Sequence, residues 1–123
     1  MKYLILIYSN PESRRLWEGF SDAEREEGWG VYAELQSDLA ASGELIVTEA
    51  LADLSLTKRI TVRDGQTLTT DGPFAEVKEQ RAGFFLLECK NIDRAIQHAS
   101  RVPEAEFGLV EVRPVMDLSG MDL

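Results

Sequence analysis

The spacing of apolar residues predicts a strand at the start of the chain. Residues 2–8 are rich in β-branched and aromatic side chains, and the turn formers at 9–11 end the run. Because side chains alternate between the two sides of a strand and every position from 3 to 8 is apolar, we expect both faces to be buried. The two faces are Tyr3, Ile5 and Ile7 on one side and Leu4, Leu6 and Tyr8 on the other.

A helix is predicted over residues 21–42. Ser21 and Glu24 have the spacing of a capping box, and Gly43 is the residue type that commonly ends a helix. The inner stripe, at helical spacing, is Gly28, Tyr32, Leu35 and Leu39.

Trp29 lies between two glycines, Gly28 and Gly30, in the first half of this helix. Each glycine disfavours a helix by about 1 kcal/mol relative to alanine, so a break at this point is an open alternative. We interpret Trp29 either as a core ring or as the wall of a cleft, and the usual burial of tryptophan favours the core.

The residue pattern in the middle of the chain predicts a strand followed by a β-hairpin. Leu45 to Leu51 has the composition of a second strand. Residues 58–63, the turn dipeptide Asp64-Gly65 and residues 66–70 have the pattern of a β-hairpin. Because this hairpin is more polar than its neighbours, we expect it to lie at a sheet edge or to project outward.

The last third of the chain repeats the strand–helix–strand order. Phe84 to Cys89 is apolar on both faces and predicts a central strand. Asn91 is expected to cap a second helix that Pro103 ends, and Leu109 to Val115 is the last strand. The inner stripe of the second helix is Ile92, Ala95, Ile96 and Ala99.

This order predicts one α+β domain over residues 1–115, with a tail at 116–123. Right-handed crossovers place both helices on one face of the sheet. The first and the central strands are nevertheless apolar on both faces, so the other face needs a covering layer. A second copy of the same sheet is the simplest layer, and we therefore expect a homodimer.

Composition and charge narrow the expected partners. A chain of 123 residues is long enough for one domain with a core. The formal net charge of −9 repels phosphate backbones, which argues against a nucleic-acid partner. The one cysteine, Cys89, rules out an internal disulfide and is interpreted as a small buried residue. No apolar run has the length of a signal peptide or a membrane span, so we expect a cytoplasmic protein without a membrane partner.

The segment after the hairpin is the least typical of either helix or strand. Asp71-Gly72-Pro73 forms a turn by its chemistry, since Asp bonds nearby backbone, Gly accepts positive φ and Pro fixes its own φ. Asp71 is interpreted either as a carboxylate at the rim of a cleft or as a turn residue, and turn chemistry favours the second. Phe74 follows the turn directly. Lys78 and Glu79 have the character of a solvated loop, with closure over a ligand as the alternative.

The motif Asp71-Gly72-Pro73-Phe74, continued to Gln80, resembles the DGPF group of the YCII-related proteins. Residues 83–88 and 110–115 are similar to later strands of that group. The resemblance covers nearly the whole chain. It implies a ferredoxin-like βαββαβ domain with an inserted β-hairpin, which pairs into a dimeric α+β barrel. The activity of the group is largely unassigned. Its genes often neighbour extracytoplasmic-function sigma factors, which makes a regulatory partner an alternative.

The wider YCII group includes members with a His–Asp pair proposed as catalytic. The two positions match Tyr32 and Val102 in this sequence, so neither catalytic residue is present. The resemblance therefore carries no His–Asp mechanism to this chain.

Glu111 and Arg113 share one side of the last strand, because they are two residues apart. Val110 and Val112 point the other way and should meet the helices, which leaves Glu111 and Arg113 on the uncovered face. Arg113 can bind an anionic or carbonyl group there while Glu111 accepts a hydrogen bond or a proton. A self-neutralising ion pair is the alternative. Tyr8 is either within reach of the same cleft or buried with one hydrogen bond.

No motif for a metal, a phosphate-binding loop or a dinucleotide is present, so no cofactor is expected. His98 lies off the inner stripe of its helix and is expected to be exposed. We predict a dimer that binds a small, partly apolar, anionic or carbonyl-bearing metabolite between its sheets, with or without a cofactor-independent reaction. The alternative is a non-enzymatic interaction or regulatory protein. The predicted ligand-binding residues are Tyr8, Tyr32, Asp71, Phe74, Glu111 and Arg113, with Tyr32 included on its family position alone.

Overall fold

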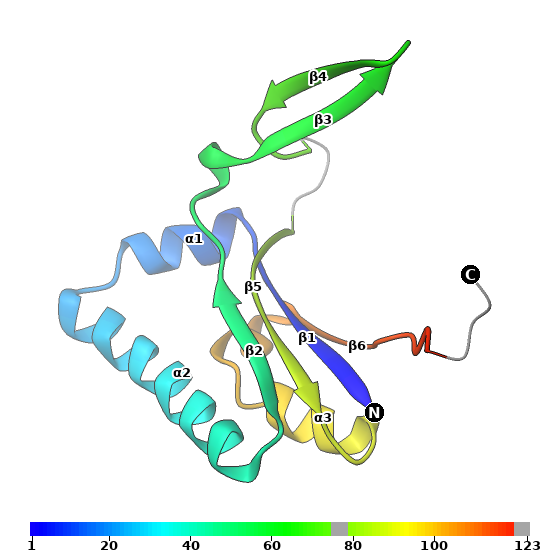
Figure 1. The fold of residues 1–123 in the computed structure, drawn as a ribbon. Coiled ribbons are helices and arrows are strands. Elements are labelled where there is room, and N and C mark those ends of the chain that lie inside the picture. The colour runs from blue at the N-terminus through cyan, green and yellow to red at the C-terminus, as the bar shows by residue number, and fades with distance from the viewer. Residues whose placement is uncertain (75–78, 120–123) are drawn as a thin grey trace.

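A four-stranded antiparallel sheet in the order β2-β5-β1-β6 forms the centre of the molecule. The computed structural model describes residues 1–74 and 79–119. Figure 1 shows the helices beside this sheet and the hairpin β3–β4 beyond one end of it. The elements are β1 (Lys2–Ser9), α1 (Pro11–Glu18), α2 (Asp22–Ser42), β2 (Leu45–Ala50), η1 (Leu54–Leu56), β3 (Lys58–Arg63), β4 (Gln66–Asp71), β5 (Gln80–Glu88), α3 (Ile92–Ala99), η2 (Pro103–Phe107) and β6 (Val110–Pro114).

The hydrophobic core lies between one face of this sheet and the helices α2 and α3. Both helices contribute to a single cluster, so the predicted placement of both on one face is confirmed. Tyr32, Leu45, Val110 and Val112 pack against the cluster from its margin. The buried members are Ile5, Ile7, Leu35, Leu39, Phe85, Leu87, Ala99 and Val102.

The opposite face of β1 differs from the prediction that both faces are buried. Leu4, Leu6 and Tyr8 are only half-buried, whereas Ile5 is 0% exposed. The physical reason is the topology: both helical crossovers return on the same side, so within the described residues no helix covers the other side.

The cap residues of α2 act as predicted. Ser21 accepts a hydrogen bond from the backbone N–H of Glu24, and the Glu24 carboxylate accepts one from the backbone N–H of Ser21. These bonds lower the pKa of Glu24, because they favour its ionised form. Gly43 ends the helix in the left-handed conformation, with φ +79°. The helix is continuous through Gly28 and Gly30, so the alternative of a break is not adopted.

Helix α1 is absent from the predicted elements, although the sequence holds its signal. Asn10 accepts a hydrogen bond from the backbone N–H of Ser13, and Ser13 Oγ accepts one from the backbone N–H of Asn10. Pro11 occupies the first turn, where its missing N–H costs nothing. The same Asn-Pro pair that ends β1 therefore begins a helix.

Helix α3 is rotated relative to the predicted stripe. Asn91 caps it as expected, but Ile92 and Ile96 are 41% and 49% exposed. The buried residues are Ala95, His98 and Ala99. The expectation of an exposed His98 is therefore wrong: its side chain faces inward and meets the Glu44 carboxylate. The helix ends at Ala99, and Pro103 begins the short helix η2 instead of ending α3.

The predicted hairpin forms a two-stranded sheet of its own. Asp64 and Gly65 both have positive φ, 51° and 75°, as a two-residue turn of type I′ requires. All six residues of β4 are exposed, and Figure 1 shows the hairpin projecting outward, as predicted.

The fold is mixed α+β with an antiparallel sheet and three α-helices, consistent with a ferredoxin-like domain. The dimeric barrel stays a prediction. Within the described residues, no helix has the length and apolar content needed to cross a membrane.

Candidate functional site

The face of the sheet opposite α2 and α3, called the open face below, has an apolar centre and a charged rim. Its members follow from the strand register, because directly opposed residues on antiparallel strands point to the same side. One row across the sheet, from β2 through β5 and β1 to β6, is Glu49, Phe84, Leu6 and Glu111. The next row is Val47, Leu86, Leu4 and Arg113. Beyond these rows, Lys2 of β1 lies opposite Glu88 of β5.

Glu111 and Arg113 occupy the edge strand β6 on the open face. Both are exposed, and Val110 and Val112 pack on the core from the other side of the strand, as predicted. Among the ion pairs and hydrogen bonds of the described residues, none joins Glu111 to Arg113. The guanidinium group is therefore available to an anion, which the alternative of a self-neutralising pair would not allow.

Tyr8 lies at the end of β1 on the same side of the strand as Leu4 and Leu6. It is half-buried and pairs with Arg81 across a bulge in the β1–β5 register. Its backbone N–H donates to the Leu109 carbonyl at 2.9 Å, which ties this end of β1 to the start of β6. Tyr8 is therefore the predicted aromatic residue that shares a face with Glu111 and Arg113.

Tyr32 lies on the helix-covered side of the sheet. It is half-buried, packs against the core from α2 and has its ring centroid 6.1 Å from that of Trp29. The sheet separates Tyr32 from the open face, so the structure does not bring it together with Glu111 and Arg113.

The preferred interpretation of Trp29 as a core ring is wrong, because Trp29 is 56% exposed. Its ring instead meets the unpredicted helix α1, whose Trp17 packs edge-on against Trp29 with the ring centroids 5.4 Å apart. A Cβ atom on Gly28 would lie 3.4 Å from the Trp17 ring, which is ordinary van der Waals contact. Arg25 completes the cluster over Trp17, at 5.7 Å from the ring centroid.

Asp71 and Phe74 belong to the base of the hairpin, where they form what we call the clasp: Lys58, Arg59, Asp71, Gly72 and Phe74. Lys58 and Asp71 form an ion pair, and Gly72 donates its backbone N–H to the Thr57 carbonyl at 2.8 Å. The Arg59 guanidinium lies 5.3 Å from the centroid of the Phe74 ring. Gly72 has φ +87°, so the turn needs glycine at this position. Asp71 is the last residue of β4, and its carboxylate pairs with Lys58 at the base of the hairpin.

The loop that follows the clasp is described only in part. Glu79 is exposed, and Lys78 lies outside the described residues. Asp71 and Phe74 are thus placed on the hairpin, at its junction with this loop, rather than on the open face.

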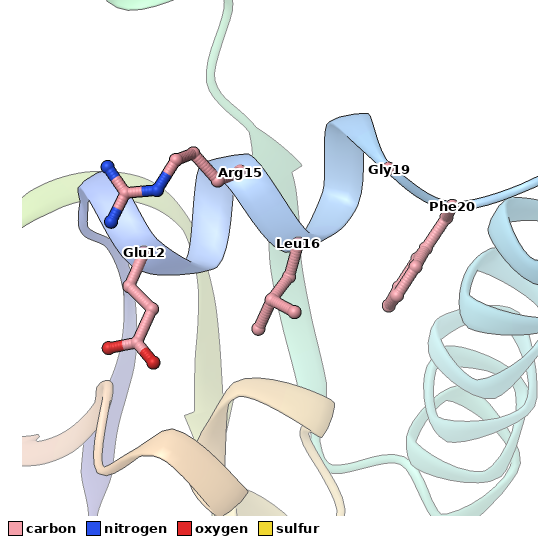
Figure 2. A pocket seen from close by; sticks show the side chains of 5 residues that line it. All are labelled: Glu12, Arg15, Leu16, Gly19 and Phe20. Atoms are coloured by element: carbon pink, nitrogen blue, oxygen red, sulfur yellow. The ribbon is translucent and has the colours of Figure 1, made fainter.

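The described surface of the chain includes two hollows that are defined by their lining residues. Figure 2 shows the one beside α1, of about 400 Å³, where Leu16 and Phe20 point to the same side and Arg15 turns away. The other, of about 460 Å³, lies between the chain start and residues 115–118. None of the six predicted ligand-binding residues lines either hollow.

A polar cluster that the sequence analysis did not identify joins the α2–β2 turn to α3. The Glu44 carboxylate accepts two hydrogen bonds from Arg94, at 3.0 and 3.2 Å, and one from Ser42 at 2.8 Å. His98 Nε2 lies 3.1 Å from the same carboxylate. The pKa of Glu44 is lowered to about 2, chiefly by its hydrogen bonds to Arg94 and then by its contacts with Ser42 and His98. Its burial acts in the opposite direction and raises the pKa.

This cluster has the geometry of a structural contact that holds the α2–β2 turn against α3. Three of the four contacts to the Glu44 carboxylate meet its Oε1 atom and one meets Oε2, and all of them come from side chains of the protein itself. Cys89 is nearby and buried as predicted; burial, and then the charge of Glu44, raise the pKa of its thiol. No sequence pattern signals the cluster, because its two halves are far apart in the chain: Arg94 and His98 are 50 and 54 positions from Glu44.

Glu104 is a second carboxylate that the sequence analysis did not identify. It belongs to η2, where its Oε2 atom is buried without a hydrogen-bond partner. Burial raises the pKa of this side chain. Within the described residues, no group of three or more His, Cys, Asp or Glu side chains is arranged to hold a metal ion.

Comparison with known proteins agrees with the fold. A family model described as the YCII-related domain matches residues 1–119. An uncharacterised protein of Rhizobium meliloti (strain 1021) is 31% identical over 117 residues, which cover 94% of this chain and 92% of that protein. The match extends over both the core strands and the projecting hairpin. The chain therefore belongs to the YCII-related domain family.

Proposed function

We propose that the chain forms a homodimer in which two open faces meet, and that a small, partly apolar metabolite with an anionic or carbonyl group binds between them. The observation that carries the proposal is the composition of the open face: an apolar centre beside an arginine and a glutamate that form no ion pair with any described residue. Apolar surface gains about 25 cal/mol for each Å² removed from water, which favours a covering layer. A two-fold dimer supplies that layer from the same patch on both chains.

Arg113 is the anion-binding group of the proposed site. Its guanidinium is a planar fork of donors that matches a carboxylate, and no described residue pairs with it. Leu4, directly opposite on β1, supplies an apolar wall next to that charge. A ligand with a carboxylate or carbonyl at one end and an apolar body fits these two neighbours.

Glu111 and Tyr8 complete the polar part of the site. Glu111 lies opposite Leu6 and can accept a hydrogen bond or a proton from the ligand, and the Tyr8 hydroxyl can donate one. Any reaction at these groups is a proton transfer, since the proposed site offers a carboxylate and a phenol and no activated nucleophile. Asp71 and Phe74 on the hairpin and Tyr32 behind the sheet lie away from this centre, so the proposal rests on Tyr8, Glu111 and Arg113.

Thermal-shift screening with small carboxylates and cyclic ketones tests the ligand. A ligand that raises the Tm of the native protein should lose its effect in Arg113→Ala. Arg15→Ala, which removes an exposed arginine from α1, the helix that meets α2 through Trp17 and Trp29, should keep the full shift. Light scattering on the same samples should give twice the chain mass for all three proteins. Ligand shifts that survive Arg113→Ala, or a native protein that is monomeric at every concentration, would contradict the proposal.

A further inference from the structure

The hairpin β3–β4, called the arm below and comprising residues 58–71, exposes more apolar surface than its own pairing can cover. Ile60 and Val62 are 67% and 64% exposed, and the register places them on one side of the arm, opposite Thr69 and Thr67. The arm pairs with no strand of the main sheet. A lone two-stranded hairpin is marginally stable in water, so these side chains call for a contact outside the described chain.

The clasp makes the arm a preformed element. The Lys58–Asp71 ion pair, the 2.8 Å hydrogen bond from Gly72 to Thr57 and the packing of Arg59 on Phe74 close the base of the hairpin. The two-residue turn at Asp64-Gly65 closes its tip. An element that is already ordered loses less conformational entropy when it docks, which favours a role in binding.

Charge points to the body of another copy of this chain as the surface that the arm meets. The arm has a net charge of +1, from the basic residues Lys58, Arg59 and Arg63 and the acidic residues Asp64 and Asp71. Since the whole chain has a net charge of −9, the rest of the chain, called the body, has a net charge of −10. Arg59 and Arg63 lie on the side of the arm away from Ile60 and Val62, so charge favours the approach of the arm to such a body while the apolar side makes the contact. We propose that the arm packs Ile60 and Val62 against the body of a second copy of the chain, beside the contact between open faces. This inference rests on the proposed homodimer.

The size of the open face supports the same occupant. Four strands at about 4.8 Å spacing and about 20 Å length give a planar footprint of roughly 400 Å². A stable interface buries about 800 Å² of accessible surface on each partner, and an arm that docks beside the open faces would add to the area that the two sheets bury. Each six-residue arm strand is about 20 Å long, which is enough to cross the width of a partner's four strands. Two-fold symmetry adds two such arms to one dimer.

Dilution series followed by analytical ultracentrifugation test the arm on the full-length chain. Ile60→Asp places a charge in the proposed contact and should weaken the dimer at least tenfold in Kd. Thr61→Asp adds the same charge to the same strand on the opposite side of the arm, and should change Kd less than twofold. Circular dichroism checks that both variants keep the native fold, which is expected because both positions are exposed.

A third variant separates the arm from the open face. Leu86→Lys puts a charge at the centre of the open face and should also dissociate the dimer if those faces meet. Dissociation by Leu86→Lys with an unchanged Kd for Ile60→Asp overturns the arm and leaves the proposed function in place. Dissociation by Ile60→Asp alone supports the arm and contradicts the face-to-face contact. Equal weakening by Ile60→Asp and Thr61→Asp overturns the arm contact as well.

Discussion

The two faces of the four-stranded sheet give the same kind of side chain two different surroundings. Ile5 is 0% exposed beneath the helices, whereas its neighbours on β1, Leu4 and Leu6, are half-buried on the open face. Both faces are apolar along this strand, so composition alone predicts the same burial for each. The difference arises because both crossovers return on one side. Apolar side chains thus indicate that a face of the sheet must be buried. The topology of the chain determines which face its own helices bury.

Truncating β1 on its two faces should produce the largest difference. Ile5→Ala leaves a cavity under α2 and should lower the free energy of unfolding by about 2–5 kcal/mol. Leu4→Ala removes a half-buried side chain and should cost the isolated chain about 1 kcal/mol or less. Urea unfolding at low protein concentration measures both values.

Protein concentration sharpens this comparison. If a second copy covers the open face, the cost of Leu4→Ala should grow as the concentration rises, because dimerisation then contributes to the measured stability. The cost of Ile5→Ala should stay constant. Equal costs for the two variants at low concentration would show that the faces do not differ.

The next largest effect is the loss of folding stability in acid, which should act through Glu44 on the helix-covered side of the sheet. The folded pKa of Glu44 is about 2, below its ordinary value of 4.5, so its stabilisation is complete above about pH 4.5 and is lost as the pH falls towards 2. Because Arg94 is 45% exposed and partly screened, we expect a loss of about 2 kcal/mol over this range. Thermal melts between pH 2 and 7 measure it.

Glu44→Gln isolates the contribution of this carboxylate. The variant should be less stable than the native protein at pH 7 and should lose less stability on acidification. Glu34→Gln changes an exposed residue of α2 and should leave the pH profile as it is. An identical acid dependence in the native protein and Glu44→Gln would mean that other carboxylates control it.

The sequence predicted the parts of the fold that depend on local chemistry. The caps Ser21 and Gly43, the Asp64-Gly65 turn and the positive φ of Gly72 follow from residue type, and each is present. The element it missed, α1, has an equally local signal in its Asn10 cap, which was interpreted only as the end of a strand. Local signals therefore fail when one pair of residues serves two elements.

What the sequence could not predict depends on contacts between distant segments. His98 is buried because Glu44, 54 positions away, lies at 3.1 Å. Trp29 is 56% exposed and packs against Trp17 of α1, a helix that the sequence analysis did not predict. Of the predicted site residues, Glu111 and Arg113 follow from strand alternation, while the position of Tyr32 behind the sheet depends on the side to which the crossover returns. The alternation of residues predicts to which side of its strand a side chain points. Only the folded topology shows which helices and strands that side contacts.

Glu104 should give the smallest effect, and of the opposite sign to Glu44. Its pKa is raised by burial, and its Oε2 atom has no hydrogen-bond partner. A raised folded pKa means that the unfolded chain releases its proton first, so stability falls as the pH rises above about 4.5 and levels off beyond the folded value. Glu104→Gln removes this ionisation and should be more stable than the native protein at pH 8, with little difference at pH 4. Glu106→Gln, an exposed neighbour in the same short helix, should shift neither melt. A Glu104→Gln variant that is less stable than the native protein at both pH values would show that the carboxylate has a hydrogen-bond partner in solution.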